Sequence, residues 1–153
     1  MATLLTSEIS ASACDARKLT EQGDRVMLAL GKQAMELSVL LIDDAGMREL
    51  NRQYRDQDRS TDVLAFSQLE GEGGGGPMLG DVVISVETAG RQAEQHQLSL
   101  DQELALLLIH GTLHLLGYDH ERSPEEAAIM KQKTWEIFSI LYPGKEAAAA
   151  CEF

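Results

Sequence analysis

Residues 110–120 read His-Gly-Thr-Leu-His-Leu-Leu-Gly-Tyr-Asp-His, and the rest of the chain is organised around this stretch. His110 and His114 stand four residues apart on a predicted helix, so their imidazoles share one face and can bind one metal ion. Gly117 follows the last turn, where a glycine can take the left-handed conformation that reverses the chain and brings His120 back beside the pair. Three nitrogen ligands with one open coordination position describe a catalytic zinc site.

The spacing of these residues distinguishes a metal site from its alternative, histidines that simply pack in the core. Three of the four histidines of the chain fall in this one window, with a glycine where the chain must turn. The same skeleton occurs in the metzincin proteases as His-Glu-x-x-His-x-x-Gly-x-x-His. Gly111 stands where those proteases carry the glutamate that activates water, and glycine has no side chain that could take a proton.

Composition limits the classes of protein to which the chain can belong. Its 153 residues suffice for one domain with a core of ordinary size. A net charge of −12 argues against nucleic-acid binding through the whole surface, so a polyanionic partner must meet a local basic patch. Cys14 and Cys151 lack metal-ligand spacing and are interpreted as free or incidental thiols of a reducing compartment. No signal peptide or membrane-spanning run is apparent, and we expect a cytoplasmic protein.

Hydrophobic periodicity and capping residues predict an alternation of strands and helices. The helix that carries the histidines opens at Ser99 with a capping box and is apolar on all sides, so it should be buried.

His96 is interpreted as a surface residue, and the five glycines within residues 70–77 predict a mobile surface loop. The domain is assigned to residues 1–142 and a tail to residues 143–153. The other predicted elements are an edge strand before Cys14, a helix over 16–30, a strand over 37–42, a helix over 45–55, strands over 63–66 and 79–86, a helix over 87–97, and a helix from Ser123 to about Leu141.

The predicted helix over residues 45–55 carries both apolar and basic residues. Three apolar residues at intervals of three and four should face the core: Met47, Leu50 and Tyr54. Four of the thirteen basic residues cluster elsewhere within twelve positions: Arg48, Arg52, Arg55 and Arg59. This cluster is a candidate phosphate-facing patch, and its alternative is a solvated helix face. Arg55 is singled out because it lies at the helix exit, just before residues 60–62, where a loop could turn its guanidinium toward a pocket.

Three segments of the chain form a distinctive set of motifs: residues 110–120, Leu-Gly-Asp at 79–81, and Asn-Arg-Gln-Tyr-Arg at 51–55 followed by Ser-Thr-Asp-Val-Leu-Ala-Phe at 60–66. Together they resemble the YbeY family of bacterial rRNA maturation endoribonucleases. The similarity covers roughly residues 36–140, with the spacing kept in all three places. Ser60 and Ser67 stand where the family commonly has proline, a difference that touches no ligand position.

The resemblance implies an α+β fold, a single domain in which helices, one of them a zincin-like metal helix, pack on a mixed four-stranded sheet. It also implies a zinc-dependent endoribonuclease, specific for single strands, that matures the 3′ end of 16S rRNA and acts in ribosome quality control. His110, His114 and His120 would be the metal ligands, and Arg55 with His114 would serve catalysis. The implied partners are single-stranded RNA, the small ribosomal subunit and assembly factors, with no membrane and no DNA.

Several roles are left open by the residues themselves. Asp119 can accept a hydrogen bond from an imidazole N–H behind the metal, or it can be a simple turn residue. If Asp119 acted as the base, a metallopeptidase would also be consistent with the pattern. A non-catalytic ribosome-assembly factor with a structural metal is a third interpretation, and the absence of a nearby cysteine as fourth ligand opposes it. The electronegative composition, with a single arginine cluster, suggests that affinity for RNA comes mainly from a ribosomal partner.

Overall fold

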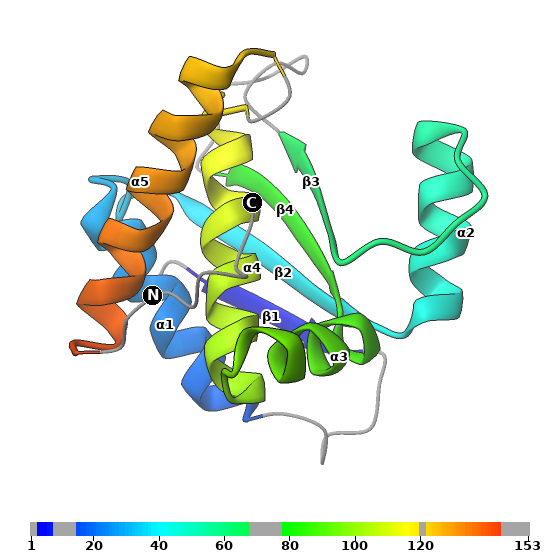
Figure 1. Ribbon diagram of the computed structural model, residues 1–153, viewed down its shortest axis with the longest axis horizontal. Helices are drawn as coiled ribbons and strands as arrows, with labels where there is room; N and C mark the ends of the chain where they lie inside the picture. The colour runs from blue at the N-terminus through cyan, green and yellow to red at the C-terminus, as the bar shows by residue number, and fades with distance from the viewer. Residues whose placement is uncertain (1–2, 8–14, 68–77, 120–121, 145–153) are drawn as a thin grey trace.

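A four-stranded sheet forms the centre of the molecule. The computed structural model describes residues 3–7, 15–67, 78–119 and 122–144. The strands are β1 (Thr3–Ser7), β2 (Glu36–Ile42), β3 (Val63–Ser67) and β4 (Met78–Ser85). Strands β1 and β2 are parallel, β2 and β4 are parallel, and β3 pairs antiparallel with β4, in the order β1-β2-β4-β3. The predicted mixed sheet of an α+β domain is therefore confirmed (Figure 1).

Helices cover both faces of this sheet, and each begins at a side chain that accepts a hydrogen bond from a backbone N–H of its first turn. The caps are Asp15, Asp43, Ser85, Ser99 and Ser123. The capping box predicted at Ser99 is complete, with Gln102 bonding back to the Ser99 N–H. The helices are α1 (Ala16–Ala29), α2 (Asp44–Arg55), α3 (Val86–His96), α4 (Leu100–Leu115) and α5 (Pro124–Leu141). All predicted elements are thus present, with bounds that differ only at terminal residues.

Side chains alternate between the two faces of the sheet and so define two separate apolar layers. Neighbouring residues of β4 illustrate the separation: Val82 packs in the same layer as residues of α1 and α4, whereas Val83 packs with Met47 of α2. The layer under α2 is the smaller one, with Ile42, Met47, Leu64 and Val83 buried and Leu40, Leu50 and Phe66 only partly covered. One face of the sheet is therefore thickly covered, and the other carries α2 alone (Figure 1).

Helix α4 lies between the sheet and a further helical layer that contains α5. Twelve of its sixteen residues are buried, as expected for a helix that is apolar on all sides. It approaches the sheet closely at Gly111, where a Cβ atom would lie 2.7 Å from Cγ1 of Val82 and 3.2 Å from Cγ2 of Val63. Gly80 makes a similar close approach, since a Cβ there would lie 2.5 Å from the carbonyl oxygen of Phe66. These two glycines set how closely α4, β3 and β4 pack.

The prediction that His96 is a surface residue was wrong. Only 8% of His96 is exposed, and its Nδ1 lies 2.7 Å from Oε1 of Glu103, which is fully buried. The contact forms because the C-terminal end of α3 packs against the first turn of α4. Burial raises the pKa of the Glu103 carboxyl, and the hydrogen bond with His96 offsets part of that rise. The pair joins α3 and α4, and the polar sequence around His96 does not indicate this contact.

The prediction that Tyr54 faces the core was also wrong. Met47 is fully buried and Leu50 packs against the α2 layer, but 66% of Tyr54 is exposed. The apolar layer under α2 is small, and Leu50 and Phe66 are themselves only partly buried in it, so it does not enclose the ring of Tyr54. The ring of Tyr54 instead meets the edge of the Phe66 ring.

Some predictions concern segments beyond the described part of the chain. These are Cys14, Cys151, the glycine-rich loop over residues 70–77, and residues 145–153 of the tail. Within the described residues, every helix is too short or too polar to span a membrane.

Candidate active site

His110 and His114 lie side by side on α4. Their ring centroids are 4.8 Å apart and the rings are inclined by 75°. His110 is buried, with 6% of its surface exposed, and His114 is half-buried. Both rings are carried by a capped helix that is packed directly on the sheet, so their positions are determined by the core rather than by a loop.

The turn after α4 forms where the glycine predicts it. Gly117 has a φ of 97°, its N–H donates to the carbonyl of His114 (3.0 Å), and the N–H of Tyr118 donates to the carbonyl of Leu113 (3.1 Å). These hydrogen bonds satisfy carbonyl groups at the end of the helix and end it. His120, the third predicted ligand, lies outside the described residues.

Arg122 ties the turn to the start of α5. Its guanidinium donates to the carbonyl of Gly117 (2.8 Å) and pairs with Asp119 (3.5 Å) and Glu126 (3.2 Å). Residues of the turn, together with Glu126 and Ile129, also line a pocket of about 220 Å³. The role of Asp119 as an acceptor behind the metal stays a prediction, and its ion pair with Arg122 is one contact that the structure describes.

The donor set that the structure brings together suits a transition metal. Neutral imidazole nitrogens are common zinc ligands, and two of them on adjacent turns of a rigid helix supply two positions of a tetrahedral site. In the part of the chain that the structure describes, no group of three His, Cys, Asp or Glu side chains is placed to hold a metal. The pair on α4 is therefore the candidate metal site, and His120 as its third ligand stays a prediction about a residue outside the described part of the chain.

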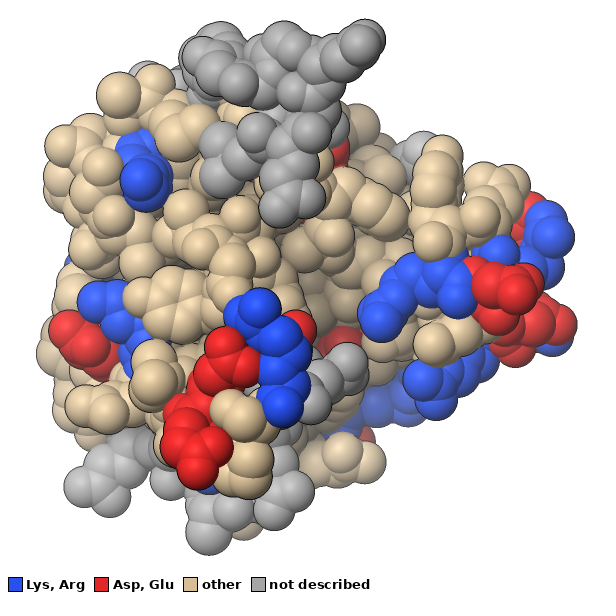
Figure 2. Space-filling view, turned by 90° about the horizontal axis from the view of Figure 1, so that it is seen from above, with Lys and Arg blue, Asp and Glu red and all other residues tan. Residues whose placement is uncertain are grey.

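The arginine cluster divides into paired and unpaired members. Arg48 binds Asp58 through two hydrogen bonds of 2.7 and 3.0 Å, and Arg52 pairs with Glu49 one turn earlier. These two arginines therefore fit the alternative interpretation of the cluster, a solvated helix face. Figure 2 shows such blue and red side chains interleaved over α2, beside a hollow that separates this helix from the body of the molecule.

Arg55 and Arg59 keep their positive charges available. Arg55 is exposed at the last position of α2, and its side chain has no hydrogen bond or ion pair with any described residue. Arg59 donates to the neutral side chain of Gln57 (3.1 Å) and contacts no described carboxylate. The predicted phosphate-facing patch is thus reduced to two guanidinium groups.

The loop after α2 is anchored at several points. Asp56 ends the helix in the left-handed conformation, with a φ of 54°. Buried Asn51 donates its side-chain N–H to the carbonyl of Arg59 (2.9 Å), which folds the loop back along the helix. Asp62 then accepts from the N–H of Val63 (2.8 Å) and from Gln92 on α3 (3.2 Å). The arginines of this loop are therefore presented from a fixed backbone.

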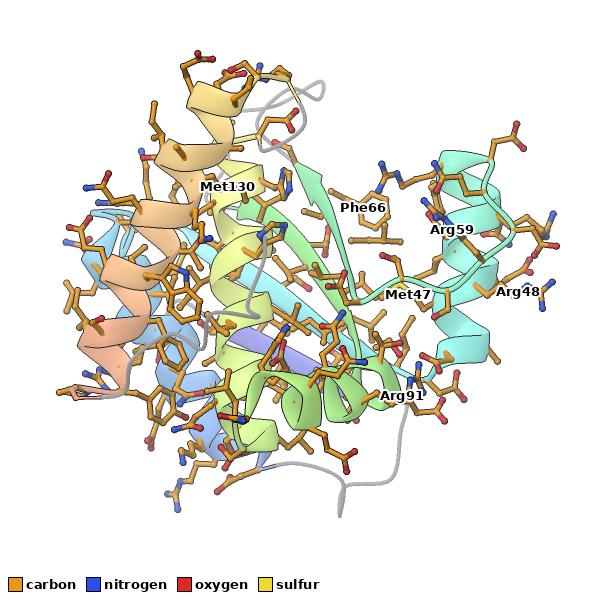
Figure 3. The ribbon with its side chains drawn as sticks, viewed as in Figure 1. Met47, Arg48, Arg59, Phe66, Arg91 and Met130 are labelled. Carbon is orange, nitrogen blue, oxygen red and sulfur yellow. The ribbon has the colours of Figure 1, made fainter. Side chains whose placement is uncertain are left out.

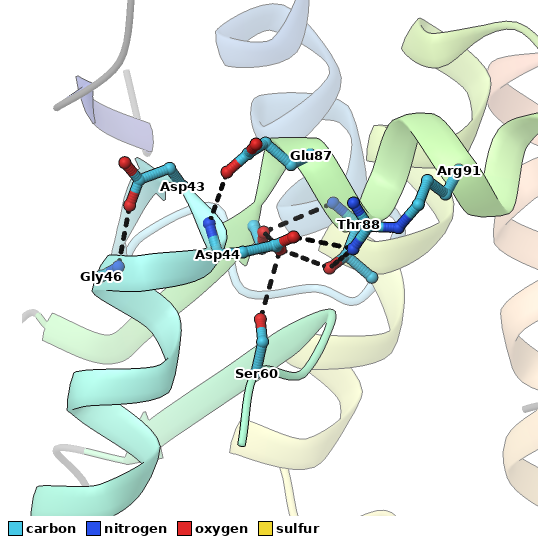
Figure 4. Close-up of polar contacts among 8 residues, drawn as sticks. Asp43, Asp44, Gly46, Ser60, Glu87, Thr88 and Arg91 are labelled. Carbon is cyan, nitrogen blue, oxygen red and sulfur yellow. Dashed lines mark hydrogen bonds and ion pairs between the residues drawn. The ribbon is translucent and has the colours of Figure 1, made fainter. Parts of the chain in front are cut away.

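Asp44 connects several segments of this arrangement, a role that no local sequence pattern indicates. Its carboxylate accepts hydrogen bonds from Ser60 (3.2 Å), Ser85 (2.6 Å) and Thr88 (2.6 Å), and it pairs with Arg91 (2.8 Å; Figure 4). It thereby joins α2, the loop before β3, and α3. Burial raises the pKa of this carboxyl, but the hydrogen bonds and the ion pair outweigh burial and lower the pKa to about 2.

Asp44→Asn should therefore destabilise the protein in a pH-dependent way. A carboxyl whose pKa falls from 3.8 to about 2 on folding stabilises the native state above pH 4. That contribution, about 2 kcal/mol at pH 7, disappears as the pH falls from about 4 to about 2. Urea unfolding of both proteins at pH 7, 4 and 3 measures the difference. Glu21→Gln, on the exposed face of α1, is the matched control, and a difference independent of pH would contradict the assignment.

Arg55 and the histidine pair approach the same end of the molecule. Helices α2 and α4 cover opposite faces of the sheet and run in the same general direction, with β3 between them (Figure 1). Arg55 terminates α2, and His114 belongs to the last turn of α4. The two sequence motifs, more than fifty residues apart, are thus placed on either side of one edge strand.

Comparisons with known proteins agree on one family. A family model described as Endoribonuclease YbeY matches residues 6–142. A protein named Endoribonuclease YbeY from Geobacter metallireducens is 48% identical over 127 residues, which are 81% of this chain and 85% of the relative. A protein of the same name from Aquifex aeolicus is 50% identical over 109 residues, 71% of this chain and 72% of the relative. The solution structure of a Thermotoga maritima protein shares the fold, with a TM-score of 0.63, 24% identity, and coverage of 94% of this chain and 99% of that one.

Proposed function

The chain belongs to the YbeY family, and on this premise we propose that it is a metal-dependent endoribonuclease that cleaves single-stranded RNA. The observation that carries the proposal is the pair of adjacent imidazoles on a buried helix whose neighbouring position, Gly111, cannot hold a base. By the family resemblance, its substrate is the 3′ end of 16S rRNA. We also propose roles in ribosome quality control in the cytoplasm, with the small subunit and assembly factors as partners.

We propose zinc as the cofactor, held by His110, His114 and His120. Three neutral imidazoles would leave a bound zinc ion its full double charge, and the ion would supply Lewis-acid chemistry by lowering the pKa of a water toward ~7 and polarising a phosphoryl oxygen. The imidazoles themselves bind and orient the ion. The place of His110 and His114 on a packed helix keeps these two rings from rearranging when substrate enters.

Arg55 supplies the protein's own contact with the scissile phosphate. A phosphodiester carries one negative charge on its non-bridging oxygens, and a guanidinium matches that pair of oxygens with two parallel N–H donors. Arg55 is suited to this contact because no described carboxylate neutralises it, in contrast to Arg48 and Arg52. In a chain of net charge −12, such a local cation is required to bring a polyanion to the site.

The peptidase alternative is opposed by packing as well as by the missing glutamate. A side chain at position 111 would enter Val82 and Val63, so this position faces the sheet and not a substrate. Asp119, the substitute base considered for that alternative, is paired with Arg122. The observations therefore favour phosphodiester cleavage.

Arg55→Ala should slow RNA cleavage about a hundredfold or more while zinc stays bound. Removing one preorganised charged donor typically costs ~3 kcal/mol of transition-state stabilisation. Single-turnover cleavage of a labelled oligonucleotide and the zinc content of the same sample measure both effects. Arg48→Ala is the matched control, since its guanidinium is already bound to Asp58. Equal cleavage by the Arg55 variant and the parent protein would remove Arg55 from the mechanism.

A substrate panel tests the function as a whole. The zinc-loaded chain and a chelator-treated sample are incubated with a single-stranded RNA, an RNA duplex and an unfolded protein such as casein. We expect metal-dependent cleavage of the single strand only. Cleavage of casein alone would establish the peptidase, and inactivity toward all three with zinc retained would support a non-catalytic assembly factor.

A further inference from the structure

An exposed aromatic side chain stands at the end of α2, where the core does not require one. Tyr54 is 66% exposed, and it lies between two arginines in the sequence pattern, Arg52 and Arg55. Exposed tyrosines are not unusual by themselves. The surroundings of this one, described next, point to a ligand with both a flat ring and a negative charge.

The ring of Tyr54 is held by a second ring. Its centroid is 5.4 Å from that of Phe66, with an interplanar angle of 65°, which is the edge-to-face arrangement that aromatic pairs prefer. Phe66 is half-buried on β3 and belongs to the layer under α2, so it provides a fixed support. Figure 3 shows Phe66 on the side of β3 that faces α2. A tyrosine ring held in this way needs little further ordering when another ring stacks on it.

Two arginines that pair with no carboxylate among the described residues, Arg55 and Arg59, belong to the same region of the chain. Arg55 is adjacent to Tyr54 in the chain. Arg59 is brought back to the same turn because Asn51, one helical turn before Tyr54, binds its carbonyl. Figure 3 shows Arg59 beside α2, on the segment that leads to β3. An aromatic face with cations beside it, on a fixed loop, has the composition of a single-strand nucleic-acid platform.

We propose that Tyr54, supported by Phe66 and flanked by Arg55 and Arg59, binds one unpaired nucleotide of the RNA substrate. The base stacks on the exposed face of Tyr54, and Arg59 contacts a phosphate next to the one that Arg55 binds for cleavage. The inference rests on the proposed function and extends it from the scissile bond to a neighbouring nucleotide. A base within a duplex is already stacked between its neighbours, so this platform selects single strands.

Stacking is expected to contribute more than charge at this site. Asp56 and Asp58 lie in the same loop as Arg59, and Asp58 is paired with Arg48. The net positive charge that a phosphate meets at this loop is therefore small. Stacking of a base on Tyr54 does not depend on that charge balance. Its strength depends little on which base is stacked, because every base has a π face. The platform therefore binds without marked sequence preference.

Binding of a labelled single-stranded RNA to the full chain tests the proposal. Fluorescence anisotropy is measured on the His114→Ala background, so that cleavage does not interfere. Tyr54→Ala and Tyr54→Leu should each weaken binding about tenfold, and Tyr54→Phe should leave it unchanged, because only an aromatic ring stacks. Leu28→Ala, a residue 62% exposed on α1, is the matched control. Equal affinity of the Leu and Phe variants, or an unchanged Tyr54→Ala variant, would overturn the proposal.

Two further measurements separate the base from the phosphate. On an oligonucleotide that lacks bases, Tyr54→Ala should have no effect, whereas Arg59→Ala should still weaken binding and lower the slope of log affinity against log salt by about 0.7. Arg17→Ala, an exposed arginine on α1, should change neither. If Tyr54→Ala weakens binding of polyglutamate as much as binding of RNA, the surface is a docking site for acidic peptides and the nucleotide proposal is wrong.

The outcome can be read independently of the enzymatic proposal. If the chain with His114 intact cleaves single-stranded RNA and Tyr54→Ala does not affect binding, the nucleotide platform is refuted and the nuclease stands. If the chain neither binds nor cleaves single-stranded RNA, both proposals fail together. Urea unfolding of the Tyr54 variants checks their fold: each should unfold in one cooperative transition, with a small shift of midpoint because the ring of Tyr54 is mostly exposed.

Discussion

Replacing His114 with alanine should reduce RNA cleavage at least about a thousandfold and lower the zinc content of the purified chain. A metal Lewis acid contributes several kcal/mol to a phosphoryl transition state, and each ~1.4 kcal/mol is a factor of ten in rate. His114 is one of two predicted ligands placed 4.8 Å apart on α4, so its removal leaves the neighbouring imidazole without its partner ligand. Single-turnover cleavage and elemental analysis of the same sample measure both consequences.

The fold should survive this substitution, which makes the loss interpretable. His114 is half-buried near the end of α4, and alanine is the residue with the highest helix propensity. His96→Gln is the matched control, because it removes the one histidine outside the motif and should leave the zinc stoichiometry unchanged. A His114→Ala protein that still contained one zinc per chain and cleaved RNA normally would show that the metal assignment is wrong.

Gly111→Ala should destabilise the protein by about 1–3 kcal/mol although alanine favours helices. The added Cβ atom would lie 2.7 Å from Cγ1 of Val82, closer than nonbonded carbon atoms can approach, so α4 must move away from the sheet. A glutamate at this position, as in the metzincin pattern, should be worse because its whole side chain must find space between α4 and the sheet. Urea unfolding at neutral pH measures the change.

Gly90→Ala on α3 provides a control with the opposite sign. Among the described residues, nothing outside the helix's own backbone and the chain neighbours lies within 4 Å of a Cβ built at Gly90, so the substitution should stabilise the protein by about 0.5–1 kcal/mol through helix propensity alone. If both glycine variants were more stable than the parent chain, the close packing of α4 on the sheet would be disproved. Opposite signs would show that Gly111 is required by packing and not by the chemistry of the site.

Local patterns predicted the parts of this protein in which neighbouring residues decide the structure. The capping box at Ser99, the turn at Gly117 and the apolar run of α4 all depend on residues within a few positions of one another. The pairing of His110 with His114 follows from helix periodicity in the same way. The prediction of a mixed sheet came from the family resemblance and not from a local pattern, since the strand order depends on contacts between distant segments.

The errors and omissions occurred where burial is decided by distant segments. His96 lies in a polar sequence but is buried against Glu103, because α3 and α4 pack at that point. Tyr54 fits the apolar stripe of α2 but is exposed, because the small apolar layer between α2 and the sheet does not enclose its ring. The hydrogen-bond donors to Asp44 come from residue 60 and from residues 85–91, both far from it in the chain, so no local pattern indicates them.

The sequence by itself determined the elements, the caps, the two imidazoles on one helix face and the family, because these follow from short-range spacing and from motif identity. Only the tertiary structure decided which arginines are neutralised, why position 111 must be glycine, and that Tyr54 rests on Phe66 beside Arg59. The physical reason is that charge pairing, steric exclusion and ring contacts depend on distances between side chains far apart in the sequence. Those distances are fixed only when the sheet and both of its helical layers have packed.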